Sequence, residues 1–325
     1  MKSDPDLTIT VVSWNTRDLL RGCLNSIYGG GALSNFDVHV VDNASSDGSA
    51  EMVRSEFPDV RLISNEANVG FARANNQSWR EARGRYWLLL NSDAEVGSGA
   101  IDALIAFMDA HPRAGLTTAR LVNPDGTPQN CAQAMPSIFR TLFEASRLHK
   151  LLPAKVRGRM LLGPYWSYDE PAPVGWTWGT ALIARREAVE EVGPLSEDFF
   201  MYGEDLEWCL RMRRNRWGIW FCPEAEVLHF GGQSSAGRWE DGARLRTKLD
   251  GIYRAIEQHR GRAYLRVLQT AALVALGIEW LSLRVRSRRS RDLSDCLDYH
   301  QHALTGKPVT PADVVLNPPK SREVL

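Results

Sequence analysis

The stretch Leu7-Thr8-Ile9-Thr10-Val11-Val12-Ser13 decides the fold, together with the helical pattern that follows it. Its apolar and β-branched side chains form one continuous run, which is typical of a strand buried on both faces. From residue 16 to residue 28, apolar side chains recur at helical spacing. A buried strand followed directly by an amphipathic helix predicts a βα unit, the building block of a parallel sheet.

The same alternation continues through the first half of the chain. Residues 38–41 and 86–90 are further apolar runs, and helical patterns occupy residues 50–57 and 71–83. Strands that alternate with helices predict a mainly parallel sheet with helices on both sides. We therefore expect an α/β, Rossmann-like fold.

Polar residues follow each of these strands, at the edge where parallel sheets bind ligands. The segments are Trp14-Asn15-Thr16, residues 42–48 (DNASSDG) and Asn91-Ser92-Asp93. A dinucleotide-binding enzyme needs Gly-x-Gly-x-x-Gly after its first strand, and that pattern is absent. The sequence therefore excludes a dehydrogenase of this type.

Two segments have residues suited to a nucleotide. Asp42 stands directly at its strand end, where it can accept a hydrogen bond from the imide N–H of uracil or thymine, while Ser46 or Asp47 caps the next helix. Residues 68–70 form a glycine turn that leads into a helix. This turn places backbone amides and Arg73 where an anion can bind.

Carboxylates also gather among large apolar side chains at Glu204, Asp205 and Glu207. The pattern from Leu206 onward predicts an amphipathic helix, so Glu204 and Asp205 fall in its first turn. Such residues are ordinarily helix caps. The alternative is that one of them is a general base.

Together these segments resemble the inverting family 2 glycosyltransferases of the GT-A fold, particularly their bacterial rhamnosyltransferase-like branch. The likeness runs from about Thr8 to about Ser234, in the family's order and spacing, and the segments that carry it are VVSWN (11–15), VDNASSDGS (41–49), NVGFA (68–72), LLNSD (89–93), FMYGED (200–205) and HFGG (229–232). The resemblance implies a catalytic domain over residues 1–243. Its nucleotide-sugar-binding half spans about 7–120, and its acceptor and catalytic half spans about 121–243.

The resemblance also assigns roles to single residues. It makes Asp205 the catalytic base, with Glu204 as the alternate, binding acceptor hydroxyls or orienting the loop. Asp93 and His229 would ligate Mn²⁺ or Mg²⁺ at the diphosphate. The metal motif reads Asn91-Ser92-Asp93 in place of Asp-x-Asp, so the site lacks one charge. The expected nucleotide-sugar-binding residues are Ser13, Asn15, Asp42, Asn68, Gly70, Arg73, Asn91, Ser92, Asp93, Trp178 and Gly179.

The segment around Trp178 and Gly179 has two interpretations. Two tryptophans between glycines, at 176 and 178, ordinarily pack into a core. Exposed tryptophan faces also suit sugar rings. The resemblance places this segment beside the donor sugar.

The C-terminal region differs in composition from the rest. Basic residues from Arg244 onward bracket an apolar run at 267–283, which is shorter than the ~20 residues of a secure transmembrane helix. We expect a basic amphipathic helical appendage over 244–303 and a tail over 304–325. The appendage would bind an anionic membrane surface, or pack on the catalytic domain or on a second subunit of a homodimer.

The composition of the chain limits the partners and the cellular compartment that we expect. The chain has 39 basic and 39 acidic residues, which argues against general affinity for nucleic acid. Five scattered cysteines suggest reduced thiols. The N-terminus lacks the pattern of a signal peptide, so we expect a cytoplasmic protein, peripheral at the inner face of the membrane.

The expected function is inverting transfer of a sugar, L-rhamnose from dTDP-rhamnose or another dTDP- or UDP-linked sugar. The acceptor would be lipid-linked or a polysaccharide in cell-envelope glycan synthesis. A sugar nucleotidyltransferase is one alternative, but it needs a glycine-rich basic loop where Ser13-Trp14-Asn15-Thr16 stands. A catalytically inactive module that binds nucleotide sugars or glycans at the membrane is another, and it would not require Asp93, Asp205 and His229 together.

Overall fold

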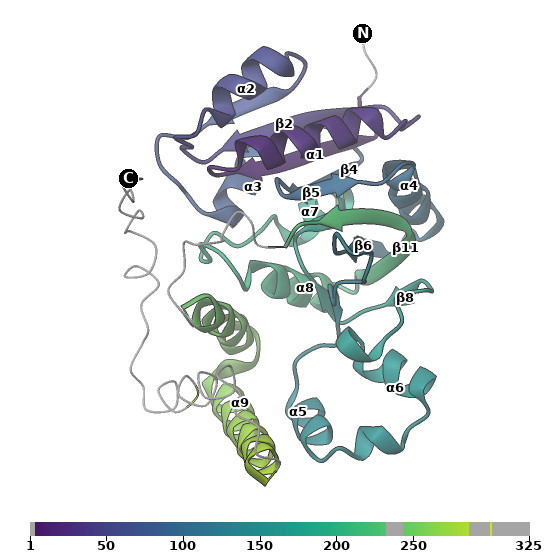
Figure 1. The fold of residues 1–325 in the computed structure, drawn as a ribbon, viewed down its shortest axis with the longest axis vertical. Helices are drawn as coiled ribbons and strands as arrows, with labels where there is room; N and C mark the ends of the chain where they lie inside the picture. The colour runs from purple at the N-terminus through teal and green to yellow at the C-terminus, as the bar shows by residue number, and fades with distance from the viewer. Residues whose placement is uncertain (1–3, 232–242, 286–299, 301–325) are drawn as a thin grey trace. The chain divides into compact units, whose positions relative to one another are not determined.

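The computed structural model of the protein describes residues 4–231, 243–285 and 300. The chain forms two compact units, one of residues 1–135 and 154–234 and the other of residues 136–153 and 235–325 (Figure 1). Residues 136–153 therefore cluster with the C-terminal unit, although the sequence analysis placed them in the acceptor half. The predicted boundaries at 120/121 and 243/244 stay predictions.

A nine-stranded mixed sheet forms the centre of the first unit, with strand order β3-β2-β1-β4-β10-β6-β11-β5 and β8 paired to β11. Its strands are β1 (Leu7–Ser13), β2 (Phe36–Asp42), β3 (Arg61–Ser64), β4 (Tyr86–Asn91), β5 (Ala94–Val96), β6 (Ala114–Val122), β8 (Ala172–Pro173), β10 (Ala181–Arg185) and β11 (Gly218–His229). A separate pair consists of β7 (Ala132–Gln133) and β9 (Trp176–Thr177).

The register of the sheet aligns the strand ends that the sequence singled out. β1 runs parallel to β2 and β4, with Ser13 opposite Asp42 and Val12 opposite Asn91. β10 runs antiparallel to both β4 and β6. The carboxyl ends of β1, β2 and β4 therefore meet at one edge of the sheet.

Helices cover both faces of this sheet, which confirms the predicted layered architecture (Figure 1). The helices of the first unit are α1 (Arg17–Gly29), α2 (Ser49–Glu56), α3 (Phe71–Trp79), α4 (Ala100–Ala110), α6 (Ala154–Leu161), α7 (Arg186–Val192) and α8 (Glu204–Arg214), with a short 3₁₀ turn η2 (Gly163–Tyr165). On the face of α3 and α8, the fully buried ring of Trp87 lies 5.1 Å from Trp79 and 5.8 Å from Trp208, centroid to centroid. This aromatic contact fixes α3 and α8 against β4.

Two elements are shorter or more broken than the patterns predict. α3 ends at Trp79, because the amides of Arg83 and Gly84 donate to the hydroxyl of Thr8 and turn the chain into β4. A basic, leucine-containing stretch at 140–162, whose pattern predicts a helix, is divided into α5 (Ile138–Ala145), the 3₁₀ turn η1 (Leu148–Leu151) and α6. Arg147, at φ +58°, separates α5 from η1.

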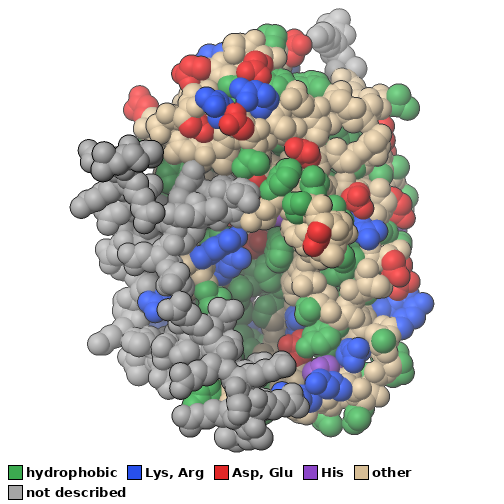
Figure 2. Space-filling view, in the orientation of Figure 1, with side chains coloured by type: hydrophobic (Ala, Val, Ile, Leu, Met, Phe, Trp, Pro, Cys, Tyr) green, Lys and Arg blue, Asp and Glu red, His purple; other side chains and the backbone are tan. Residues whose placement is uncertain are grey.

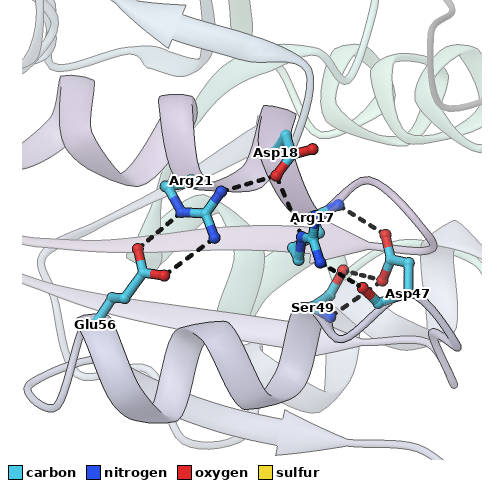
Figure 3. Close-up of polar contacts among 6 residues, drawn as sticks. All are labelled: Arg17, Asp18, Arg21, Asp47, Ser49 and Glu56. Carbon is cyan, nitrogen blue, oxygen red and sulfur yellow. Dashed lines mark hydrogen bonds and ion pairs between the residues drawn. The ribbon is translucent and has the colours of Figure 1, made fainter.

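The loop after β2 is held against the starts of two helices (Figure 3). Asp47 accepts hydrogen bonds from the amide of Arg17 at 2.8 Å and from the amide of Ser49 at 3.1 Å, so it caps α1 and α2 together. Arg21 on α1 pairs with both carboxylate oxygens of Glu56 on α2, at 2.8 and 3.0 Å. Acidic and basic side chains are accordingly intermixed over these helices at the top of Figure 2.

The second unit contains α5, η1 and a long helical element, α9 (Ala243–Val285). Gly261 interrupts α9 with φ +81° and ψ +163°, so α9 is two helices joined at a kink. No helix among the described residues is both long and apolar enough to span a bilayer. The predicted tail at 304–325, the basic cluster 286–291 and Cys296 lie outside the described residues.

Candidate active site

Buried hydroxyl groups connect the first and fourth strands at the ligand edge. The hydroxyl oxygens of Ser13 and Thr16 lie 3.0 Å apart, and those of Thr16 and Ser92 lie 2.9 Å apart. All three side chains are buried. The structure therefore joins the predicted residues Ser13 and Ser92 through Thr16, which the sequence analysis did not single out.

Asp42 is the last residue of β2 and lies at this edge of the sheet, followed by a loop that Asn15 holds in place. Asn15, at φ +52°, accepts the amide of Ser46 at 2.6 Å and donates its own amide to the Ser45 hydroxyl at 2.9 Å. One carboxylate oxygen of Asp42 accepts the Ser45 amide at 3.1 Å. The other, Oδ1, is buried and receives no hydrogen bond from the described residues. A ligand N–H is the kind of group that would satisfy it.

The turn before α3 is shaped by a close contact with residue 200. Asn68 accepts the amide of Gly70 at 3.0 Å, and the amide of Phe71 donates to the carbonyl of Phe200 at 2.8 Å. Gly70 has φ +86°, and a Cβ there would lie 2.5 Å from the Phe200 carbonyl oxygen. Only glycine fits this turn.

The side chain of Arg73, another predicted site residue, forms an ion pair at the protein surface. Its guanidinium lies 3.1 Å from a carboxylate oxygen of Glu197, and its side chain is 56% exposed. The predicted contact of Arg73 with a phosphate stays a prediction, because an anion would have to compete with Glu197 for it.

Asp93 and His229 face each other across the pairing of β5 with β11. The amide of Phe230 donates to the Asp93 carbonyl at 3.0 Å, and the Nε2 of His229 lies 3.4 Å from Oδ1 of Asp93. Both side chains are buried. On its other side, the imidazole contacts the side-chain oxygen of Gln129 at 2.7 Å.

The donor set at this pair fits a hard divalent cation. A carboxylate oxygen and an imidazole nitrogen at this separation can both reach one ion at about 2.0–2.2 Å. Within the described parts of the chain, no group of three or more His, Cys, Asp or Glu side chains could hold a metal. Asp93 and His229 would thus be two protein ligands of an ion whose other ligands come from elsewhere.

The segment with Trp178 and Gly179 borders the Gly70 turn. A Cβ on Gly179 would lie 3.2 Å from the ring of Phe71, and the amide of Asn91 donates to the carbonyl of Thr180 at 2.8 Å. Trp178 is partly buried against the hydrophobic core. The structure thus places this segment between the end of β4 and the start of α3.

The carboxylates of the Glu204–Asp205 pair begin α8. Tyr202 and Gly203, at φ +69° and +98°, turn the chain into the helix. Glu204 is 5% exposed. Burial, together with the negative charge of Asp205, raises the pKa of Glu204 to about 8. A carboxyl with this pKa is protonated at neutral pH.

Glu207, the third carboxylate, has a structural role. It forms an ion pair with Arg211 at 2.8 Å. Arg211 also donates to the carbonyls of Val192, Gly193 and Pro194. This pair anchors α8 to the segment that precedes it.

The residues expected from the sequence to form the site did not include Thr16, Phe200 and Gln129. Phe200 acts through its carbonyl, which a side-chain pattern does not reveal. Gln129 lies 100 residues from His229 in the sequence, and only the pairing of β6 with β11 brings them together. Residues 123–127 are rich in Asn, Pro, Asp and Gly, and this composition predicts a turn. That turn was the available signal that the backbone around Gln129 is held in a defined conformation.

Residues 8–158 match the model of the family described as glycosyl transferase family 2. An N-acetylglucosaminyl-diphospho-decaprenol L-rhamnosyltransferase of Mycobacterium tuberculosis is 32% identical over 216 residues, covering 59% of this chain and 66% of the relative. A low-salt glycan biosynthesis hexosyltransferase of Haloferax volcanii is 27% identical over 228 residues, covering 69% of this chain and 67% of the relative. The chain thus spans about two thirds of these relatives' lengths.

Solved structures share the fold. A mannosyltransferase from Pyrobaculum calidifontis, in complex with GDP-Man and Mn²⁺, superposes with a TM-score of 0.57 at 18% identity, covering 94% of this chain and 82% of that one. GalNAc-T7 with UDP, GalNAc and Mn²⁺ superposes with a TM-score of 0.55 at 15% identity, covering 79% and 48%. The predicted GT-A fold is confirmed.

The pKa of Glu204 predicts how stability varies with pH. Its pKa rises from 4.5 in the unfolded chain to about 8 in the folded protein, so its contribution to stability is full below 4.5 and is lost as the pH rises through about 8. Because glutamine does not ionise, the Glu204→Gln variant should not lose stability through this group as the pH rises. Urea unfolding at pH 5 and pH 8 should show that the variant gains stability relative to wild type as the pH rises.

Glu66→Gln, at an exposed position, is the control and should show no such gain. An equal pH dependence of wild type and Glu204→Gln would show that Glu204 is ionised in the folded protein.

Proposed function

Because the chain belongs to glycosyltransferase family 2, we propose that it is an inverting glycosyltransferase that moves a sugar from a nucleoside diphosphate to an acceptor hydroxyl. The observation that carries this proposal is the Glu204–Asp205 pair at the start of α8, in which burial and the neighbouring charge of Asp205 raise the pKa of the Glu204 carboxyl to about 8. The carbonyl of Phe200, just before this pair, holds the start of α3 at the ligand edge. A single charged carboxylate beside the donor platform suits a one-step displacement.

The chemistry follows from the charges that develop. The acceptor oxygen attacks the anomeric carbon, the bond from that carbon to the diphosphate oxygen breaks, and the acceptor proton passes to Asp205. Attack from the face opposite the leaving group inverts the anomeric configuration. A positioned general base contributes ~10²–10⁴-fold to such a step. Protonated Glu204 is a donor that can bind an acceptor oxygen without competing for the proton.

The residues that would hold a metal are Asp93 and His229, and the ion would be Mn²⁺ or Mg²⁺. When bound, it would neutralise charge that builds on the diphosphate. The 3.4 Å separation of the two donor atoms supports this assignment. Activity should fall to background in EDTA and return with added Mn²⁺ or Mg²⁺, and full activity in EDTA would contradict a metal role.

The donor that we propose is a pyrimidine nucleotide sugar, with dTDP-L-rhamnose as the first candidate. The buried Oδ1 of Asp42, which no described residue satisfies, supports recognition of an imide N–H. The rhamnosyltransferase from Mycobacterium tuberculosis supports the sugar and suggests an acceptor linked to a polyprenol diphosphate. The sugar nucleotidyltransferase is disfavoured because its glycine-rich basic loop is absent after β1, and the inactive binding module because the chain has Asp205, Asp93 and His229 together.

Attachment to an anionic membrane would bring the enzyme to a lipid-linked acceptor, at the inner face of the cell membrane. In α9, Val267, Val274 and Ile278 are 53%, 51% and 47% exposed and follow helical spacing along one stripe. Arg260, Arg262 and Arg266 precede this stripe. Apolar side chains next to basic ones suit the surface of such a membrane. A homodimer through the same stripe is the second candidate.

The role of Asp205 is tested by removing its charge. Asp205→Asn keeps the size of the side chain but cannot accept the proton, so kcat should fall by ~10² or more while donor affinity stays near normal. Glu204→Gln is the matched control and should retain more activity, because glutamine resembles the protonated acid. Inactivity of Glu204→Gln with an active Asp205→Asn would move the base by one residue, and normal turnover in both would refute this chemistry.

The donor base is tested at Asp42. Asp42→Ala should weaken binding of dTDP and UDP by about 1.5–3 kcal/mol, the value of a hydrogen bond to a charged group, and should leave weak GDP binding unchanged. Calorimetry with the three nucleotides measures the difference. Equal dTDP affinity in wild type and variant would remove Asp42 from the base site.

Membrane attachment is tested with the full chain. Serine at positions 267, 274 and 278 should reduce sedimentation with liposomes that contain anionic lipid, whereas Val156→Ser, at an exposed valine of α6, should have no effect. If wild type does not sediment with these liposomes and the triple variant instead dissociates an oligomer in size-exclusion chromatography, the stripe is a subunit contact.

A further inference from the structure

The turn Asn123-Pro124-Asp125-Gly126-Thr127-Pro128-Gln129 leads from the end of β6 to His229, and its polar side chains form a continuous series of hydrogen bonds. Hydrogen atoms are not observed directly, so the direction of each bond must follow from the chemistry of its partners. In this turn the partners leave a single consistent set of directions. That set requires a proton on Nδ1 of His229.

The series begins at Asp125, which can only accept when ionised. The hydroxyl and the amide of Thr127 donate to its Oδ1 at 2.6 and 3.0 Å. These bonds, led by that of the hydroxyl, hold the pKa of Asp125 below its usual value. The one proton of the Thr127 hydroxyl is thereby used. Its oxygen must accept from the side-chain amide of Asn123, at 2.9 Å.

The orientation of Asn123 then fixes that of Gln129. Because Asn123 Nδ2 faces Thr127, its Oδ1 faces Gln129 Nε2 at 2.8 Å. The same nitrogen of Gln129 donates to the carbonyl of His229, also at 2.8 Å. Two acceptors on this side require the NH₂ group of Gln129. Its Oε1 must therefore face His229 Nδ1, at 2.7 Å.

We propose that Gln129 is a positioning residue, which holds His229 with its proton on Nδ1 and so turns the lone pair of Nε2 toward Asp93. The opposite tautomer would set two acceptors, Oε1 and an unprotonated Nδ1, against each other at 2.7 Å. With Gln129 in place, Nε2 and the Asp93 carboxylate present two acceptors 3.4 Å apart to a common cation. Gln129 is 9% exposed, so water has little access to replace its bond.

This inference rests on the proposed metal role of Asp93 and His229, but its first consequence can be measured without metal or substrate. Two-dimensional ¹⁵N NMR on histidine-labelled protein, at alkaline pH where imidazoles are neutral, reports the tautomer of His229. Wild type should show the proton on Nδ1, because Gln129 offers an oxygen there. Gln129→Leu should shift the population toward the proton on Nε2.

The second consequence is metal affinity, measured by titrating Mn²⁺ in the presence of dTDP. Loss of a residue that orients a metal-binding histidine lowers affinity ~10–100-fold. Gln129→Leu should show a loss of this size. Thr127→Val, on the exposed turn, should show a smaller loss, while Thr127→Ser keeps the hydroxyl and should not. Gln133→Leu is the control, because its side chain donates only to the Asn130 carbonyl among the described residues.

The proposal is overturned if wild-type His229 carries its proton on Nε2, or if Gln129→Leu changes neither the tautomer nor the affinity. Failure of the metal role itself has a different signature, since His229→Ala would then leave Mn²⁺ affinity unchanged while the NMR result for Gln129 stood. The Thr127 pair keeps the test decisive if Gln129→Leu does not fold.

Discussion

The contact of Phe200 with Gly70 and Phe71 is the constraint on which the geometry of the site depends. The Phe200 carbonyl accepts the Phe71 amide at 2.8 Å, and it lies so close to Gly70 that no side chain fits there. α3 starts at Phe71, and α8 starts shortly after Phe200, at Glu204. One backbone contact therefore holds the Gly70 turn and the segment that leads into Glu204 and Asp205 in a single arrangement, although the two segments are distant in the sequence.

Two carboxylate oxygens in the candidate site are buried without a hydrogen-bond donor from the described residues. Asp42 Oδ1 and Glu204 Oε2 are both buried and accept no hydrogen bond from the described residues. Such groups destabilise a fold, because burial removes the water that would otherwise solvate them. Their presence is explained if a ligand supplies the missing partner at Asp42 and if Glu204 stays protonated. The Arg211–Glu207 ion pair lies one helical turn away, and Arg211 also donates to the carbonyl of Pro194. This pair therefore has a structural role.

Much of the scaffold could be predicted, because it rests on local patterns. The apolar run of β1 and the helical spacing of α1 identify a βα unit wherever they occur. Predictions were less accurate where distant residues end or extend an element. Thr8 stops α3 before the predicted end at residue 83. The pattern at 226–229 predicts a short strand that ends at His229, but β11 begins at Gly218, since a register shift between Cys222 and Glu226 lets it continue along β6.

The sequence by itself determined the fold class, the polar strand ends and the identity of the chemical groups, because residue type and spacing along the chain are sufficient for each. Asp42 could be named from its position at a strand end, whereas Asp93, Asp205 and His229 took their expected roles from the resemblance to the family 2 glycosyltransferases. Only the tertiary structure decided which charged groups of the site have shifted pKa values and which form ion pairs. Burial beside Asp205 raises the pKa of Glu204, and Glu197 forms an ion pair with the exposed guanidinium of Arg73. Protonation, ion pairing and tautomer depend on which atoms lie within a few ångströms, and that proximity is created by packing between segments far apart in the chain.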